Sequence, residues 1–416
     1  MFIKKIEWQI ASKYLKSKRK ESFISFISWF ALIGIALGVA VLIIVMSVMN
    51  GFRKDIVDGI IGVSGHIVIR NPSNKIENYN DYITKIKYNP QITNVSPSIE
   101  EQVLLSSKTG SLGGLVYGLT YEDLISRNQL YKNLINTDLA EFNKAENVIL
   151  IGRVVARELN LNKNDNITLI SPNGYITLMG SIPKIATFKI IGIVNTGMYQ
   201  YDSSLVILPF SVAQSFFNYG KSTQKIDLFI KNPQQAYNVK HKISNIIPQN
   251  VYIETWEDSN AYLINALKVE KNVMFLILSL VILIATFNIV SGLIMLVRSK
   301  TKEIAILKTM GLSSSSVVKI FLLIGIRIGF IGTFVGLVIG LLFSYNIEKI
   351  RKSLEYFLKA NLFSEEVYFL STLPSQVDIL QVLIIIIIAL FFVVISSVYP
   401  ALRASSITPI EGLKYD

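Results

Sequence analysis

Apolar residues gather in four long stretches of the chain that contain no charged side chain. The stretches cover residues 22–52, 272–297, 328–347 and 379–402. A helix needs about 20 predominantly apolar residues to cross the hydrocarbon core of a bilayer. The pattern therefore predicts an α-helical membrane protein with four transmembrane helices, placed at residues 23–50, 271–298, 319–347 and 379–402.

The four predicted spans are unevenly spaced along the chain. A mostly polar insert, residues 51–270, separates the first span from the second, whereas the short segments 299–318 and 348–378 join the last three. An insert of this length can bury a hydrophobic core of its own. We therefore predict one large domain on one side of the membrane, with terminal segments at residues 1–22 and 403–416.

The distribution of Lys and Arg predicts how the chain is oriented. Lys and Arg outnumber acidic residues in residues 1–22 and 298–319, whereas acidic residues outnumber basic ones in 348–378. Basic residues close to the spans are retained in the cytoplasm. We therefore predict that both termini are cytoplasmic, that residues 1–22 form a basic amphipathic segment, and that residues 51–270 lie outside. The formal net charge of +12 then reflects topology and attraction to anionic lipid, not nucleic-acid binding.

Two segments near the ends of the insert resemble each other. One begins His66-Ile67-Val68-Ile69-Arg70-Asn71-Pro72 and the other Ile226-Asp227-Leu228-Phe229-Ile230-Lys231-Asn232-Pro233. Each is typical of a strand, an Asn-Pro turn, a helix and a second strand. Two such units predict an α+β domain, a split βαβ sandwich of residues 60–110 and 223–256 with a β-rich lobe of residues 111–222 inserted. The alternative is chance similarity of short segments rich in Lys, Asn and Ile.

An apolar loop is expected between two strands of the β-rich lobe, at residues 171–184. It mixes turn residues with apolar ones that include Tyr175, Ile176, Met179 and Ile182. Such a loop either folds back onto its own lobe or binds a partner. The residues alone leave both alternatives open.

Motifs for catalysis, metal binding and nucleotide binding are missing from the sequence. The chain has no cysteine, and His66 and His241 stand in no metal-binding spacing. Gly220-Lys221-Ser222 resembles the end of a phosphate-binding loop but lacks the upstream glycine. We therefore expect no enzyme activity, metal or nucleotide in this chain. The first span is longer than a signal-peptide core, so we expect a retained anchor and a mature chain that begins near Met1.

The segment between the second and third spans predicts a short, well-delimited helix. Thr301 is expected as its N-cap, Glu303 lies in the first turn, and Gly311 supplies the residue that ends it. Ile304, Leu307 and Gly311 fall on one face. That face could insert into a groove of a cytosolic protein or lie flat on anionic lipid.

Three parts of the chain carry a resemblance to a known family. Residues 302–311, Lys-Glu-Ile-Ala-Ile-Leu-Lys-Thr-Met-Gly, resemble the coupling helix of FtsX-like ABC-transporter permeases, and Tyr399-Pro400-Ala401-Leu402-Arg403-Ala404 with Thr408-Pro409 resembles their terminal signature. The first span, from Phe26-Ile27-Ser28 to Ser47-Val48-Met49-Asn50-Gly51-Phe52, is similar to the lipoprotein-releasing permeases of the Lol C/E type. The resemblance runs almost from end to end.

The resemblance implies a permease subunit in the bacterial inner membrane, with its large domain in the periplasm. It implies a dimer with a second permease subunit, two cytosolic ATPase subunits that bind ATP and Mg, and mechanotransmission that moves lipoproteins to a periplasmic chaperone. Residues matching the family's ATPase-contacting helix are Glu303, Ile304, Ala305, Leu307, Met310 and Gly311. The family's chaperone-binding hook corresponds to the apolar loop, with Tyr175, Ile176, Met179, Ile182 and Pro183.

The layout of the spans suggests where the acyl chains of a lipoprotein would enter. The outer ends of the first two spans place Val45, Met49, Phe275 and Leu278 at the root of the insert. Two rival functions share the same topology: export of another substrate, and transmission of ATPase motion to an external cell-wall hydrolase. A membrane-anchored scaffold without an ATPase is a third, but it does not explain the coupling-like helix.

The third span carries one unexpected charge and a row of small residues. Arg327 either extends to the cytoplasmic headgroups or faces protein within the bundle, because a lipid-facing charge would be costly. Lys302, in the coupling segment, replaces the arginine common in the family. Glycines permit close approach of helices in membranes. They occur here at Gly325, Gly329, Gly332, Gly336 and Gly340.

Overall fold

The computed structural model describes residues 5–15, 22–135, 137, 139–144, 147–177, 180–247, 251–360, 362–364, 370 and 372–410. The chain forms two compact units, which we call the helical unit and the sheet unit. The helical unit comprises Met1–Phe52, Leu267–Lys359 and Leu373–Asp416, and the sheet unit comprises Arg53–Ala266 and Ala360–Thr372.

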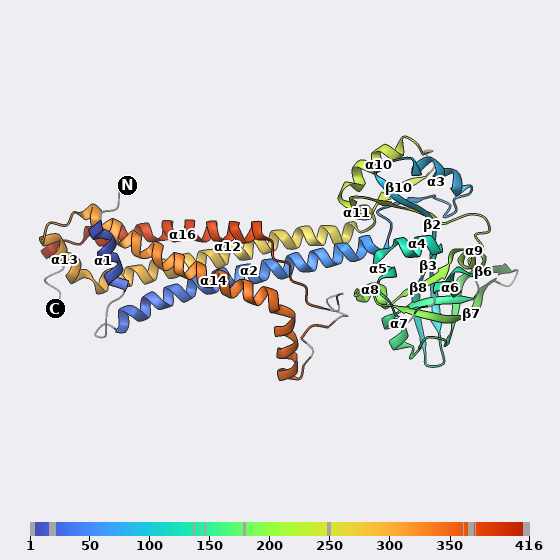
Figure 1. Ribbon diagram of the computed structural model, residues 1–416, viewed down its shortest axis with the longest axis horizontal. Helices are drawn as coiled ribbons and strands as arrows, with labels where there is room; N and C mark the ends of the chain where they lie inside the picture. Colours follow the sequence, from blue (N-terminus) through green and yellow to red (C-terminus); the bar gives the residue numbers. More distant parts are fainter. Residues whose placement is uncertain are drawn as a thin grey trace. The chain divides into compact units, whose positions relative to one another are not determined.

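Four long helices carry the apolar stretches (Figure 1). They are α2 (Ser22–Val63), α12 (Ala261–Ser299), α14 (Ser314–Leu358) and α16 (Ile379–Ser406). Among the residues that the structure describes, these four helices are long and apolar enough to cross a membrane. The prediction of four spans is therefore confirmed. Two shorter helices, α1 (Lys5–Leu15) and α13 (Thr301–Thr309), complete the described helices of this unit.

The third long helix continues past its predicted span. Residues 348–358, expected in a loop after the third span, continue helix α14 to Leu358. The guanidinium of Arg351 binds the carboxylates of Glu348 and Glu355, one turn away on either side. Such pairs stabilise a helix without an apolar environment. The helix ends at Lys359, whose φ of 49° is left-handed.

Glycines on α14 bring it close to two other helices. A Cβ added to Gly325 or Gly329 would collide with Ser397 or Val393 of α16. The row Gly332, Gly336 and Gly340 contacts α2 instead, and a Cβ at Gly336 would lie 2.5 Å from the carbonyl oxygen of Ala36. The prediction of close helix contacts at these glycines is confirmed.

The sheet unit contains a ten-stranded mixed sheet whose path is β10-β1-β9-β2-β3-β8-β5-β7-β4, with β6 paired to β2 and β7. The strands are β1 (Ile67–Arg70), β2 (Ile92–Ser106), β3 (Ser111–Leu119), β4 (Leu134–Ile135), β5 (Val148–Gly152), β6 (Asn166–Thr177), β7 (Gly180–Val194), β8 (Leu205–Pro209), β9 (Lys225–Ile230) and β10 (Tyr252–Thr255). Strand β2 pairs with β9 near its start and with β3 and β6 near its end. One strand therefore belongs to both halves of the sheet.

The two similar segments form equivalent structures. Helix α3 (Tyr79–Lys87) lies between β1 and β2, and α10 (Ala236–Ser244) lies between β9 and β10. The four strands are antiparallel in the order β10-β1-β9-β2, so strands of the two similar segments alternate in the sheet. Asn71 and Asn232 each accept a hydrogen bond from the backbone N–H two residues later, at 3.3 and 3.1 Å. The predicted Asn-Pro turns thus use one mechanism in both units.

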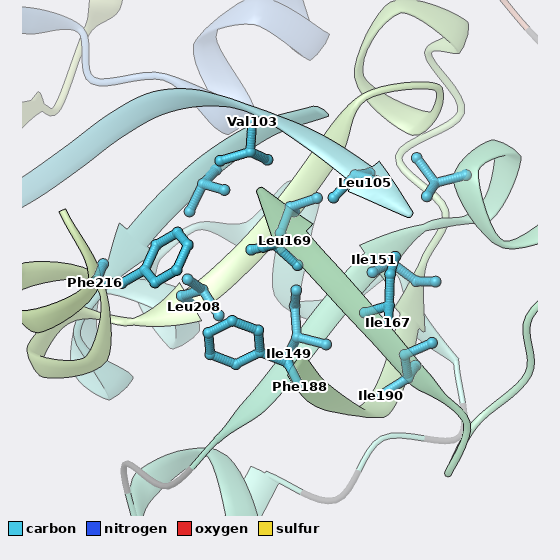
Figure 2. Packing of buried hydrophobic residues seen from close by; sticks show 14 of the residues in the cluster. Val103, Leu105, Ile149, Ile151, Ile167, Leu169, Phe188, Ile190, Leu208 and Phe216 are labelled. Carbon is cyan, nitrogen blue, oxygen red and sulfur yellow. The ribbon is translucent and has the colours of Figure 1, made fainter. Parts of the chain in front are cut away.

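The second half of the sheet encloses a hydrophobic core (Figure 2). Leu105, Ile149, Ile167, Leu169 and Ile190 are completely buried in it. The pairs β3–β8 and β5–β7 are parallel, whereas β6–β7 is antiparallel. Short helices connect or flank the strands of the unit: α4 (Tyr121–Ser126), α5 (Asn128–Tyr131), α6 (Leu139–Asn143), α7 (Arg153–Glu158), α8 (Tyr199–Asp202), α9 (Phe210–Phe216), α11 (Trp256–Ser259) and the 3-10 turn η1 (Pro233–Gln235).

Candidate functional site

Helix α13 is the coupling-like segment. The predicted N-cap is wrong, whereas the predicted C-terminal residue is confirmed. Thr301 is not the N-cap. Its hydroxyl donates to the carbonyl oxygens of Val297 and Arg298, at 3.2 and 2.8 Å, in the last turn of α12. The Thr301 hydroxyl is therefore bonded to the last turn of α12 and does not cap the first turn of α13. At the other end Gly311 adopts a φ of +95°, as expected for the residue that ends the helix.

The sides of α13 divide into a buried and an exposed set. Ile304 and Ala305 are 1% and 0% exposed, and Ile304 belongs to the core of the helical unit. They attach α13 to its own chain and are not available to a partner in this conformation. Met310 and Gly311 are exposed, Leu307 is half-buried, and Ile306 is 44% exposed. Ile306 was missed, although its spacing of four from Met310 placed the two on one face.

Polar contacts within the chain involve both ends of α13. The ammonium of Lys300, which is buried, lies 2.5 Å from the carboxylate of Glu303. The ammonium of Lys308 donates to the carbonyl oxygens of Ser405 and Ile407, at 2.5 and 2.9 Å. These carbonyls lie at the C-terminus of α16, where helical partners are missing. The Lys308 contacts therefore join α13 to the end of α16.

Arg327 on α14 contacts helix α1. Its guanidinium lies 3.6 Å from the ring centroid of Trp8 and donates a hydrogen bond to the hydroxyl of Ser12. Two turns earlier, the ammonium of Lys319 lies 3.9 Å from the carboxylate of buried Glu7. Of the two alternatives for Arg327, the structure supports contact with protein, and that protein is the N-terminal helix of the same chain.

The expected apolar loop is a long hairpin. Strands β6 and β7 pair from Asn166 opposite Lys189 to Thr177 opposite Gly180, with one irregularity between Ser171 and Tyr175. Of the candidate partner-binding residues, Ile182 is 55% exposed and Pro183 is exposed. Ile185, which the sequence did not single out, is 60% exposed. Met179 lies outside the described residues, as do the side chains of Tyr175 and Ile176.

The structure describes the side chains of two of the four residues at the expected entry site for acyl chains. Val45 and Met49 are half-buried on α2, whereas the side chains of Phe275 and Leu278 on α12 lie outside what the structure describes. Deeper in the helical unit, a cavity of about 30 Å³ lies between α2, α12 and α16. Ten residues line it, among them Leu42, Val281 and Phe392. A cavity of this volume holds little more than one small group.

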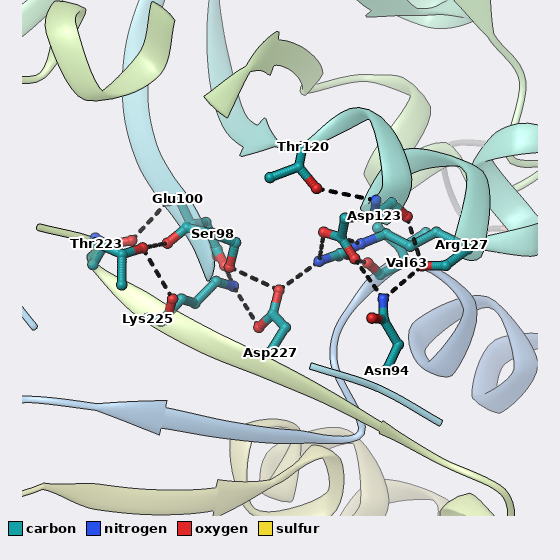
Figure 3. A network of polar contacts seen from close by, with 12 residues as sticks. Val63, Asn94, Ser98, Glu100, Thr120, Asp123, Arg127, Thr223, Lys225 and Asp227 are labelled. Carbon is teal, nitrogen blue, oxygen red and sulfur yellow. Dashed lines mark hydrogen bonds and ion pairs between the residues drawn. The ribbon is translucent and has the colours of Figure 1, made fainter. Parts of the chain in front are cut away.

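A buried polar network stands beside the end of α2 (Figure 3). The guanidinium of Arg127 binds the carboxylates of Asp123 and Asp227, at 2.8 and 2.6 Å, and donates to the carbonyl oxygen of Val63, the last residue of α2. The hydroxyl of Ser98 donates to Asp227 at 2.8 Å. Burial alone would raise the pKa of Asp227, but the charges of Lys225 and Arg127 lower it. The network attaches the end of α2 to β9 and α4, a connection the sequence did not predict.

A second buried contact joins the same region to β9. The Nδ1 atom of His66 accepts a hydrogen bond from the backbone N–H of Ile230, at 3.0 Å. Burial lowers the pKa of His66 to about 4, so the ring is neutral at pH 7. A cavity of about 550 Å³ lies beside His66 and Arg127. No cluster of His, Asp and Glu that could hold a metal occurs in the described part of the chain.

Comparison with known proteins identifies the family. Residues 28–246 match the MacB-like periplasmic core domain, and residues 275–409 match the FtsX-like permease C-terminal domain. The lipoprotein-releasing system transmembrane protein LolC of Neisseria meningitidis is 32% identical over 415 residues, which are 99% of each chain. The chain belongs to the LolC/LolE family of lipoprotein-releasing transmembrane proteins.

Other LolC/LolE proteins show similarity over the same length. LolE of Haemophilus influenzae is 30% identical over 409 residues, covering 97% of this chain and 98% of its own. Among solved structures, the periplasmic region of MacB from Actinobacillus actinomycetemcomitans is 15% identical, with a TM-score of 0.34 over 50% of this chain and 96% of its own. Within this LolC/LolE-family chain, the FtsX-like match includes α13, and the MacB-like match includes the β6–β7 hairpin.

Proposed function

We propose that this chain is the permease subunit of an ATP-driven complex that extracts lipoproteins from the bacterial inner membrane and passes them to a periplasmic chaperone. The single observation that supports this most is similarity to LolC and LolE proteins along almost the whole chain. Moving an acyl chain out of lipid costs about 0.8 kcal/mol for each methylene, so extraction needs an energy source. ATP and Mg would bind a separate cytosolic ATPase dimer.

The proposed arrangement follows from the charges near the spans. Both termini and α13 lie in the cytoplasm, and the sheet unit lies in the periplasm. Within that unit the strands β10-β1-β9-β2 with α3 and α10 form the split βαβ sandwich, and the remaining strands form the inserted β-rich lobe. A second permease subunit, identical or homologous, completes the membrane part.

Helix α13 is the proposed contact for the ATPase. Glu303, whose side chain is 42% exposed, and the apolar residues Ile306 and Met310 offer a carboxylate and an apolar ridge. Buried Ile304 and Ala305 and the Lys308 contacts would convert a push on α13 into movement of α16. Widening of the apolar space between α2, α12 and α16 would then admit or expel acyl chains near Val45, Met49, Phe275 and Leu278.

The β6–β7 hairpin is the proposed contact for the chaperone. Ile182, Pro183 and Ile185 are exposed on β7, and Tyr175, Ile176 and Met179 belong to the same hairpin. An exposed apolar strand pair fits a soluble carrier that itself binds acyl chains in an apolar cavity.

Photocrosslinking in cells tests this function. A photoreactive amino acid replaces Tyr175 or Ile182, and captured proteins are identified by mass spectrometry, with Tyr88, exposed elsewhere on the sheet unit, as the control position. We expect a soluble lipoprotein chaperone to be captured from positions 175 and 182 and not from position 88. Capture of a cell-wall hydrolase or of an efflux adaptor would retain the family and overturn lipoprotein release as the function.

A further inference from the structure

The end of helix α14 is longer than a membrane span requires. The helix has 45 residues, roughly 68 Å at the rise of an α-helix, whereas about 20 residues cross the hydrocarbon core. Residues 328–347 contain no charge, and charged residues return at Glu348. About three turns of α14, residues 348–358, therefore continue beyond the hydrocarbon core. In Figure 1 this end of α14 turns away from the rest of the helix and runs across the direction of the bundle.

Three charged groups on this end of the helix are turned inward. The side chains of Glu348, Arg351 and Glu355 are only 28%, 12% and 17% exposed. Arg351 binds both carboxylates, at 2.6 and 2.8 Å, and Glu348 also accepts a hydrogen bond from the backbone N–H of Leu373 at 3.1 Å. The two carboxylates and one guanidinium leave one negative charge, which is offset by the ammonium of Lys352, 3.4 Å from Glu348.

The outward part of the same turns is amphipathic. Ile347, Ile350, Leu354 and Phe357 recur at spacings of three and four and lie on one face of the helix. Leu354 is 49% exposed and Phe357 is 81% exposed. A second face carries exposed basic and aromatic residues, which are Lys349, Lys352, Tyr345 and Tyr356.

We propose that residues 347–358 form an interfacial helix whose partner is the surface of the bilayer. The apolar face with Leu354 and Phe357 lies against acyl chains. Lys349 and Lys352 bind the phosphates of anionic lipids, Lys352 from a position 3.4 Å from the carboxylate of Glu348 that leaves its side chain 66% exposed. Three observations favour lipid over a protein: direct continuation from an uncharged span, aromatic residues just beyond the hydrocarbon core, and basic residues beside the apolar face.

The proposed interfacial helix would hold the lipid headgroups at a fixed position along the axis of the membrane-spanning part of α14. This proposal goes beyond lipoprotein release and requires only that α14 crosses a bilayer. The expected partner is the lipid leaflet at the end of α14, whichever substrate the complex moves.

Spin labels on single cysteines test the proposal, because the chain has no cysteine of its own. Leu354→Cys and Phe357→Cys label the apolar face, and Lys352→Cys labels the polar face. Leu283→Cys, in the apolar stretch of α12, and Tyr88→Cys, on the sheet unit, are matched exposed controls for lipid and water. The full-length chain is purified with the subunits that accompany it and reconstituted in vesicles of phosphatidylethanolamine and phosphatidylglycerol.

Collision of each label with oxygen and with a water-soluble nickel chelate reports its surroundings. We expect the oxygen-to-nickel ratio at positions 354 and 357 to be several-fold higher than at 352 and 88, and lower than at 283. Ratios at 354 and 357 equal to that at 88 would overturn the proposal, since both sites would then be in water. Exclusion of both reagents would also overturn it, because a protein partner would then cover the face.

The lipid dependence tests the basic residues separately. Omitting phosphatidylglycerol is expected to lower the ratio at position 357, and Lys349→Gln with Lys352→Gln is expected to remove that dependence. An unchanged ratio at position 357 without anionic lipid would overturn the assignment of Lys349 and Lys352 to lipid phosphates.

Discussion

Lys308 joins α13 to the end of α16 by two hydrogen bonds. Its ammonium, which has three N–H donors, donates to two carbonyl oxygens at the end of α16. The contact lies within one chain, so it can be weakened without touching the surface of α13 that is proposed to meet the ATPase.

Replacing Lys308 by Met is expected to separate ATPase binding from transport. Each hydrogen bond to a charged group contributes about 1.5 to 3 kcal/mol, so the loss should lower lipoprotein release by about tenfold or more. The measurement is release of a lipoprotein from vesicles together with co-purification of the ATPase, which should be unchanged. Lys85→Met, an exposed lysine in the last turn of α3, is the matched control. Equal release by the Lys308 variant and the natural chain would contradict the role.

His66 makes the sheet unit sensitive to acid. The folded protein holds its pKa at about 4, whereas the unfolded chain titrates near its usual value of about 6.5. Between these values only the unfolded chain binds the proton, so stability falls as the pH is lowered through this window, by up to about 3 kcal/mol. Thermal unfolding of the full-length chain from pH 7 to pH 4 measures this.

His66→Gln removes the titrating ring and retains an acceptor for the N–H of Ile230. The variant is expected to lose less stability between pH 7 and pH 4 than the natural chain. The same pH dependence in both proteins would show that other groups cause it.

At the scale of elements, the contact of α14 with α2 depends on the absence of side chains. A Cβ at Gly336 would lie 2.5 Å from a backbone oxygen of α2, which cannot move aside without moving the helix. Gly336→Leu is expected to destabilise the helical unit by about 1 to 3 kcal/mol or more, the usual cost of overpacking. Thermal unfolding in detergent measures it. Val338→Leu, at an exposed position on the same helix, should be nearly neutral, and equal losses in both variants would contradict the packing role.

The β6–β7 hairpin presents its apolar residues without needing them for its fold. Ile182 and Ile185 are more than half exposed, so Ile182→Ser with Ile185→Ser should leave the thermal unfolding temperature almost unchanged. Binding of the chaperone to the full complex is expected to weaken by about tenfold or more, because two apolar contacts of about 1 to 2 kcal/mol each are lost. Tyr88→Ser is the control at another exposed position, and similar binding by all variants would refute the hairpin as the contact.

At the scale of the whole molecule, the orientation in the membrane is the expectation on which the proposed function depends. Tyr88 and Met310 are 84% and 79% exposed, and the chain has no cysteine. Tyr88→Cys is expected to react in intact spheroplasts with a maleimide that cannot cross membranes, whereas Met310→Cys should react only after lysis and removal of the ATPase proposed to cover it. The reverse pattern would place α13 outside and would exclude a cytosolic ATPase as its partner.

The sequence determined the features that depend on local patterns. Four uncharged stretches predicted the four long apolar helices, because hydrocarbon imposes length and composition on any helix that crosses it. The repeated Asn-Pro turns and Gly311 were equally predictable, since each acts through the backbone within two residues of itself. The extension of α14 was missed because its ion pairs resemble the charges of a loop.

Only the tertiary structure decided which side of each element is buried and which distant groups meet. Ile304 and Ile306 are alike in sequence, yet one lies in the core and the other is exposed, because that depends on the neighbours of α13. Arg127 meets Asp227 across 100 positions, and Arg327 meets Ser12 across 315. Charged side chains pair according to distance in space, and a single sequence does not contain those distances. Local chemistry thus determined the elements, and packing decided which of their residues are left for partners.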